Sequence, residues 1–226
     1  NGFAGVVNII NPLIPVDKPL RDENIETNFG YQTSGGELKT ALKFGKSIDN
    51  YTIRGSGSFL SSGAYDLANT SNKQANSSKF MTSGGVGFTY NNGENYFGFS
   101  ADKLEAVYSL PGPEGEENFT SLNPTRNTVN FKSSISLDYS LIEKLNLEGT
   151  ASEYNHSERT GVGVNHNINF FNDAYELKTS INHKSLISQN SNGLIGFHFQ
   201  NKDQGALGQE EGHLERTKTN SFAFFI

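Results

Sequence analysis

Two carboxylates and an imidazole lie within four consecutive residues in a polar stretch of the sequence, at Glu210, Glu211 and His213. Zinc accepts both carboxylate oxygen and imidazole nitrogen, so these three residues are a partial zinc ligand set. A solvated, charged loop would have the same composition, and that alternative stays open. The three residues are the predicted metal-binding residues of this chain.

A second acidic group, Glu114, Glu116 and Glu117, lies in a segment without histidine. Clustered carboxylates can hold a hard cation weakly, whereas zinc prefers nitrogen and sulfur ligands. A solvated acidic loop is the other interpretation. The sequence therefore gives this group at most the role of a low-affinity collector of cations.

Catalytic motifs are missing from the sequence. It contains no Gly-x-Ser-x-Gly nucleophile elbow, no Walker phosphate loop and no cysteine. None of the five histidines is spaced i, i+4 from another, which is the spacing that marks a helical metal site. We expect a binding function without catalysis and without a resident cofactor, so a zinc ion at Glu210, Glu211 and His213 would be a bound ligand and not a cofactor.

The composition predicts an all-β protein. The mean hydropathy of −0.53 is low for 226 residues, yet the chain has 17 Phe, 9 Tyr and a net charge of only −6. Disordered chains lack aromatic residues and carry a stronger charge bias. The slight acidity also offers no basic patch, so no nucleic-acid partner is expected.

Side chains alternate between apolar and polar along Thr128–Tyr139. A strand has a side-chain period of two, so this segment would have one apolar face and one wet face. The pattern recurs in segments of about ten residues, the length that crosses a bilayer when tilted. We expect ten strands, at Ile25–Gln32, Leu38–Phe44, Tyr51–Phe59, Phe80–Tyr90, Tyr96–Asp102, Thr128–Tyr139, Leu145–Glu153, Tyr175–His183, Leu194–Gln200 and Ser221–Ile226.

Long polar connections alternate with short ones, except at the first hairpin. The long ones are predicted at Leu60–Lys79, Lys103–Asn127, Tyr154–Ala174 and Asn201–Asn220. Outer-membrane barrels have short turns at the periplasmic end and long loops at the outer end. The pattern therefore favours an antiparallel transmembrane β-barrel. A soluble or surface-displayed β-sandwich adhesin is the alternative, in which the apolar faces would be buried between two sheets.

A family resemblance supports the barrel. Gly2–Ile10 (GFAGVVNII) resembles the end of the plug domain of TonB-dependent outer-membrane receptors, with Ala4 in place of the first glycine of the family pattern. Three segments are similar to the zinc-uptake receptors of that family: Val107–Gly112 (VYSLPG), Ala206–Glu211 (ALGQEE) and Thr217–Phe225 (TKTNSFAFF).

The resemblance implies a fragment of a larger receptor. Residues 1–11 would be the end of the plug, 12–24 a linker, and 25–226 the first part of the barrel. Such a receptor lies in the bacterial outer membrane and imports a scarce nutrient, here a metal ion or metal complex. Its partners would be membrane lipid, its own plug and, through the plug, the TonB complex. Ten strands with two open edges are not expected to fold alone.

One departure from the resemblance concerns the metal. The zinc-uptake receptors carry a histidine-rich outer loop, and the matching segment here, Ser109–Asn127, has no histidine. In that subfamily a glutamate from the loop near Glu210 and Glu211 faces the plug and contributes to the site. The resemblance therefore implies Glu210 or Glu211 as a ligand, while zinc itself is the less supported part of the expectation.

Overall fold

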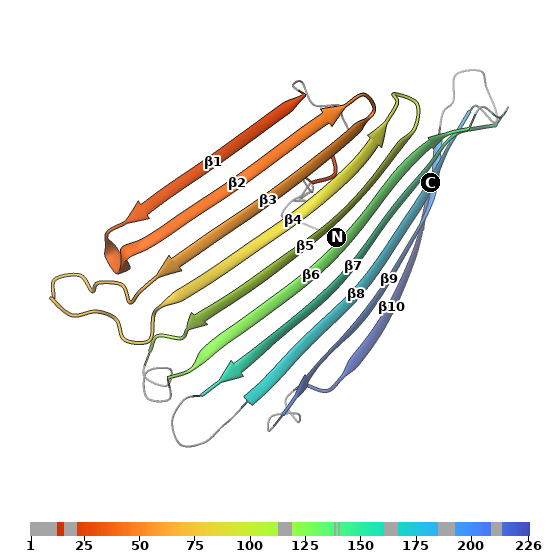
Figure 1. Cartoon of the computed structure of the whole chain (residues 1–226). Coiled ribbons are helices and arrows are strands. Elements are labelled where there is room, and N and C mark those ends of the chain that lie inside the picture. The colour runs from red at the N-terminus through yellow and green to blue at the C-terminus, as the bar shows by residue number, and fades with distance from the viewer. Residues whose placement is uncertain are drawn as a thin grey trace.

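The chain forms one antiparallel sheet of ten strands in sequence order (Figure 1). The computed structural model describes residues 13–15, 22–112, 119–137, 139, 141–160, 167–184, 193–208 and 214–226. The strands are β1 (Glu23–Gln32), β2 (Glu37–Ile48), β3 (Tyr51–Ser62), β4 (Lys79–Asn91), β5 (Tyr96–Ser109), β6 (Ser121–Ser136), β7 (Ile142–Arg159), β8 (Asn167–His183), β9 (Gly193–Leu207) and β10 (Thr217–Phe225).

The predicted all-β class and the count of ten strands are confirmed. The only helical element in the described residues is the 3₁₀ turn η1 (Ser34–Gly36), so they contain no helix that could cross a membrane. Figure 1 shows β1 and β10 at opposite edges, with β7–β10 turning out of the plane of β1–β5. The sheet is strongly curved but not closed.

We call the two ends of the sheet the turn end and the loop end. The turn end carries connections 49–50, 92–95, 137–141 and 184–192, and the loop end carries η1, 63–78, 110–120, 160–166 and 208–216. An Asn-Gly turn follows β4 at the turn end. Gly93 has φ 92°, and the Asn92 Oδ1 atom accepts hydrogen bonds from the Glu94 and Asn95 amides at 3.1 and 2.7 Å.

Three of the four predicted long connections are shorter than predicted. The strands continue to Ser109, Arg159 and Leu207, and β6, β8 and β10 begin earlier than predicted, at Ser121, Asn167 and Thr217. Only the connection 63–78 agrees with prediction. β6 also ends at Ser136, three residues before the predicted end. The physical reason for the longer strands is a change in side-chain pattern near the loop end, described below.

The sheet has an apolar face and a polar face. Cross-strand partners share a face, and one row on the apolar face runs through Ile53, Phe88, Phe99, Phe131, Gly149, Leu177, Phe199 and Phe222. The corresponding row on the polar face runs through Arg54, Gly87, Ser100, Asn130, Thr150, Glu176 and Gln200. The predicted alternation is thus confirmed across the sheet.

Burial is inverted relative to an ordinary soluble domain. On the apolar face Phe224 is 82% exposed and Ile25 76%, whereas Ser100 and Thr89 on the polar face are 0% and 3% exposed. Among exposed large hydrophobic residues within strands, only Tyr108 and Leu194 lie on the polar face. This difference indicates that the sheet curls toward its polar face. It also means that no second sheet covers the apolar face within the described residues.

The expected N-terminal segments are described only in part. Residues 1–11, predicted as the end of the plug, lie outside the described residues. The predicted linker 12–24 ends earlier than expected, because Glu23 and Asn24 already belong to β1. Leu13 and Ile14, from the same linker, are 6% and 5% exposed.

Candidate functional site on the polar face

Polar side chains bond across strands over the middle of the polar face. Lys132 and Glu148 form an ion pair at 2.9 Å, and the His198 Nε2 atom lies 2.8 Å from the Glu176 carboxylate. The Asn130 side chain donates to the Ser100 hydroxyl at 3.3 Å and accepts from the Thr150 hydroxyl at 3.1 Å. The register also places Lys39, Lys43, Arg54, Lys132 and Lys178 on the polar face.

The segment Leu13–Ile14 lies on this polar face, against glycines of β4 and β5. A Cβ atom on Gly87 would be 2.1 Å from the Leu13 carbonyl oxygen, and one on Gly98 would be 2.1 Å from the Ile14 Cγ2 atom. Real Cβ atoms do not approach so closely, so only glycine permits this contact without displacement. Gly87 and Gly98 therefore allow the segment that precedes β1 to pack closely against the sheet, and we call this contact surface the seat of Leu13–Ile14.

Toward the loop end the polar face becomes apolar. One row of cross-strand neighbours there consists of Leu60, Met81, Ala106, Pro124, His156, Phe170 and Ala206. Ala106 and Pro124 fall side by side because the adjacent pair, Glu105 and Thr125, is in register. We call these seven residues the inner apolar row.

Aromatic stacking strengthens the inner apolar row. The His156 and Phe170 rings are stacked with centroids 4.5 Å apart, and Tyr154 meets His156 edge-on at 5.8 Å. The His156 Nδ1 atom is buried and has no hydrogen-bond partner among the described residues. His156 was predicted to lie in an outer loop; that prediction is wrong, because β7 extends to Arg159 and carries His156 on its inner side.

On β5–β10 the opposite face changes in the reverse sense, whereas β3 and β4 keep Phe59 and Phe80 on that face. One polar row there consists of Lys103, Asn127, Glu153, Asp173, Asp203 and Lys218. Polarity thus inverts between the faces on these strands as they pass toward the loop end. Because the outer face is polar at these positions, the ends of the strands have the sequence pattern of polar loops.

A cavity of about 860 Å³ opens beside the inner apolar row. Its apolar walls come from β3–β6 and include Leu60, Met81, Leu104, Ala106, Tyr108 and Pro124. Its polar end is the carboxylate of Glu37, which is only 6% exposed and pairs with Lys39 at 2.5 Å and with Lys79. Burying a carboxylate is costly unless it is paired, and two ammonium groups meet that requirement.

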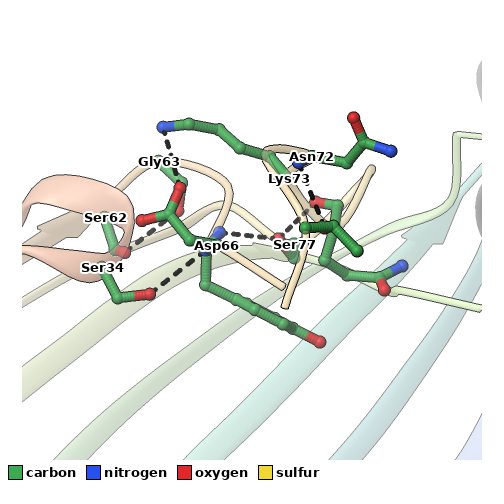
Figure 2. Close-up of polar contacts among 10 residues, drawn as sticks. Ser34, Ser62, Gly63, Asp66, Asn72, Lys73 and Ser77 are labelled. Carbon is green, nitrogen blue, oxygen red and sulfur yellow. Dashed lines mark hydrogen bonds and ion pairs between the residues drawn. The ribbon is translucent and has the colours of Figure 1, made fainter. Parts of the chain in front are cut away.

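The connection 63–78 contributes Tyr65, Ser77 and Ser78 to the lining of this cavity. Figure 2 shows the polar contacts around Asp66 in the same connection. The Ser34 hydroxyl accepts from the Asp66 amide at 3.1 Å, and Gly63 donates to the Gly35 carbonyl at 2.9 Å. Within the connection, Asp66 forms an ion pair with Lys73 at 3.8 Å. These contacts fix the connection against η1.

A second connection is tied to the first through Asn76. Its side-chain Nδ2 atom donates to the carbonyls of Leu110 and Thr120, each at 2.8 Å. These two residues are the first and last of the connection 110–120. Two loop-end connections are thus cross-linked beside the cavity, and Ser77 and Pro111 from them line it.

The outer-face row ends in an ion cluster between β9 and β10. Arg216 donates to Asp203 from Nε and Nη2 at 2.8 and 2.6 Å, and Lys218 lies 3.4 Å from the same carboxylate. The Arg216 hydrogen bonds lower the pKa of Asp203 to about 2. Burial and the neighbouring carboxylate of Glu153 raise the pKa of Asp173. Asp203 lies beyond Phe199, the last apolar outer-face residue of β9 before the polar row.

Replacing Arg216 should therefore shift the titration of Asp203. In the wild type, carbon-detected NMR of the carboxyl group should give a midpoint pH near 2, as the pKa of about 2 requires. A carboxyl group with a lowered pKa stabilises the fold above its ordinary value of about 3.9, and that contribution is lost as the pH falls toward the lowered value. In Arg216→Gln the midpoint should rise toward the ordinary value, while Arg126→Gln, on the other face, should leave it unchanged. An unchanged midpoint in Arg216→Gln would contradict the bidentate pair.

The predicted metal residues are not brought together by anything in the described structure. Glu210, Glu211 and His213 lie outside the described residues, as do Glu114, Glu116 and Glu117. Within the described part of the chain, no group of three His, Asp or Glu side chains could hold a metal ion. The metal site therefore stays a prediction. His198 lies on the polar face, where its Nε2 atom pairs with Glu176.

The sequence did not predict the cavity or the ion pairs of Glu37 at its polar end. Glu37, Lys39 and Lys79 come from two strands that are separated in the sequence, and only the register brings them together. A usable signal was present in β5, where Leu104, Ala106 and Tyr108 alternate with Lys103, Glu105 and Val107. No protein-family model and no curated protein matches the sequence.

Proposed function

We propose that this sheet is a sector of the wall of a transmembrane β-barrel in the bacterial outer membrane. One observation carries the proposal: large hydrophobic side chains are exposed on one face, while serine and threonine are buried on the other. In water such a face would collapse against another layer. In a bilayer the same face would contact lipid, and the polar face would line the lumen.

Strand length and edge geometry support this proposal. The strands have 9 to 18 residues, and about 9–11 tilted residues cross a bilayer. β1 and β10 each lack a second neighbour among the described strands, and such edges cannot remain unpaired in lipid. Further strands of a longer protein would close the barrel.

We assign the parent protein as a TonB-dependent receptor that imports a scarce nutrient by binding and gated release, without catalysis. The support is the resemblance of Gly2–Ile10 to the end of a plug, together with the seat for Leu13–Ile14 on the polar face. A plug fills the lumen, so the chain that leaves it would run along that face. Membrane lipid, the plug and the TonB complex would be the partners.

A bare metal ion is one candidate cargo. Its support is limited to the composition of Glu210–His213 and to the resemblance of Ala206–Glu211 to a loop of zinc-uptake receptors. The rival class, a β-sandwich adhesin, would need a second sheet over the apolar face. The described residues form a single sheet, which favours the barrel.

Epitope tags should test the orientation of the proposed barrel. A tag inserted beside Asn72, in connection 63–78, should be detected by antibody on intact cells, because long loops face the exterior. A tag beside Asn92, in the turn 92–95, should be detected only after the cells are permeabilised. The reverse labelling pattern would refute the orientation, and detection of neither tag in the outer-membrane fraction would refute the barrel.

A further inference from the structure

We infer that the loop-end cavity binds an organic ligand that has an apolar body and an anionic group. This inference deepens the proposed function, and it rests on the polar face being the lumen of an importer. It names the chemistry of a ligand at a site for which the resemblance to receptors supplies no residues. The argument rests on shape, lining and charge.

The size and lining of the cavity suit an organic molecule. Its volume of about 860 Å³ falls within the range of about 300–1,000 Å³ that is typical of small-molecule pockets. Such pockets are mostly apolar, with a few polar groups that fix orientation. Here Leu60, Met81 and Leu104 supply the apolar wall, and the charged groups gather at one end.

The position of the apolar wall is the informative point. A lumen that only passed water and polar solutes would keep serine, threonine and glycine on its inner face, as the rows nearer the turn end do. Exposed hydrophobic groups in a wet lumen cost free energy unless something covers them. The inner apolar row lies on the opposite side of the sheet from Phe80 and Val107, so contact of the outer face with lipid does not explain it.

The charge at the polar end selects an anion. Lys39 and Lys79 carry two positive charges against the single negative charge of Glu37, and all three line the cavity. Lysine and arginine bind carboxylates and other oxyanions through charge-assisted hydrogen bonds.

Binding of naphthalene-2-carboxylate to the full-length protein in lipid nanodiscs should test this inference. The probe has a flat apolar body and one carboxylate, and its matched cation is naphthalen-2-ylmethylamine. Isothermal titration against empty nanodiscs removes the contribution of lipid. We expect saturable binding of the carboxylate, at least about tenfold tighter than binding of the amine.

Two pairs of variants locate the site. Met81→Gln combined with Leu60→Asn should weaken carboxylate binding about tenfold, whereas Leu194→Asn, at the other end of the same face, should not. Lys79→Gln leaves the Lys39–Glu37 pair in place and should remove most of the preference for the carboxylate. Lys178→Gln is its matched control on the polar face.

Three outcomes would overturn the inference. They are the absence of carboxylate binding above empty nanodiscs, a preference for the amine, and equal losses in the cavity and control variants. The first would indicate that a segment of the protein, such as the plug, already fills the cavity. Heat-dependent mobility of the barrel band reports assembly separately, so failure at this cavity in an assembled barrel leaves the proposed function standing.

Discussion

Val129→Arg should block assembly of the protein into the outer membrane, whereas Thr128→Arg should be tolerated. The two residues are neighbours on β6 but lie on opposite faces, because Val129 pairs with Ala101 and Thr128 with Asp102. A charged residue on the lipid face costs about 2–4 kcal/mol near the bilayer midplane. An arginine at position 128 would instead face a wet lumen beside the Asp102 carboxylate.

The measurement is the fraction of folded, heat-modifiable protein in the outer membrane after expression of each variant. Val129→Thr is a useful further control, since it changes polarity without adding charge, and it should assemble nearly as well as the wild type. Equal assembly of the two arginine variants would count against lipid contact on the apolar face. Strong loss in Thr128→Arg alone would indicate that the two faces are assigned in reverse.

The middle parts of the strands were predictable because one face is apolar and the other face is polar there. In β6, Val129 and Phe131 alternate with Asn130 and Lys132, and a period of two is enough to identify a strand and its apolar face. Sequence reasoning failed toward the loop end, where the rule reverses. In β7, Glu153 and Asn155 point outward while Tyr154 and His156 point inward, so a search for outward hydrophobic residues finds a loop instead.

The candidate site was much less predictable than the sheet. Histidine and clustered carboxylates attract attention in a sequence because they are the ligands of metals. The cavity is instead built from ordinary residues such as Leu60, Met81 and Lys79, whose meaning depends on cross-strand register. A shift of one residue in that register would exchange the two faces of a strand. Sequence composition therefore indicated a sheet with one apolar and one polar face. Only the cross-strand register indicated where a ligand could bind.

Gly87→Ala should release the segment Leu13–Ile14 from the polar face. The new Cβ atom would lie 2.1 Å from the Leu13 carbonyl oxygen and 2.8 Å from its carbonyl carbon. Because both contacts are to backbone, no change of side-chain rotamer can relieve them, and the segment or the strand must move. Overpacking of this kind costs about 1–3 kcal/mol, and each 1.4 kcal/mol changes an equilibrium about tenfold.

A single cysteine at position 14 can report that release, since the sequence has no other cysteine. Ile14 is 5% exposed, so Ile14→Cys should react slowly with a maleimide, and adding Gly87→Ala should raise the rate about tenfold or more. Gly84→Ala is the matched control, because its Cβ atom would face the apolar side and come no closer than 3.6 Å to the Ser56 carbonyl oxygen. If Gly84→Ala and Gly87→Ala raised the rate equally, general loosening of β4 would explain the result, and the seat would lose its support. A slow rate in both would mean that Leu13–Ile14 is held by contacts other than the glycines, which would remove close backbone approach as the reason for glycine at position 87.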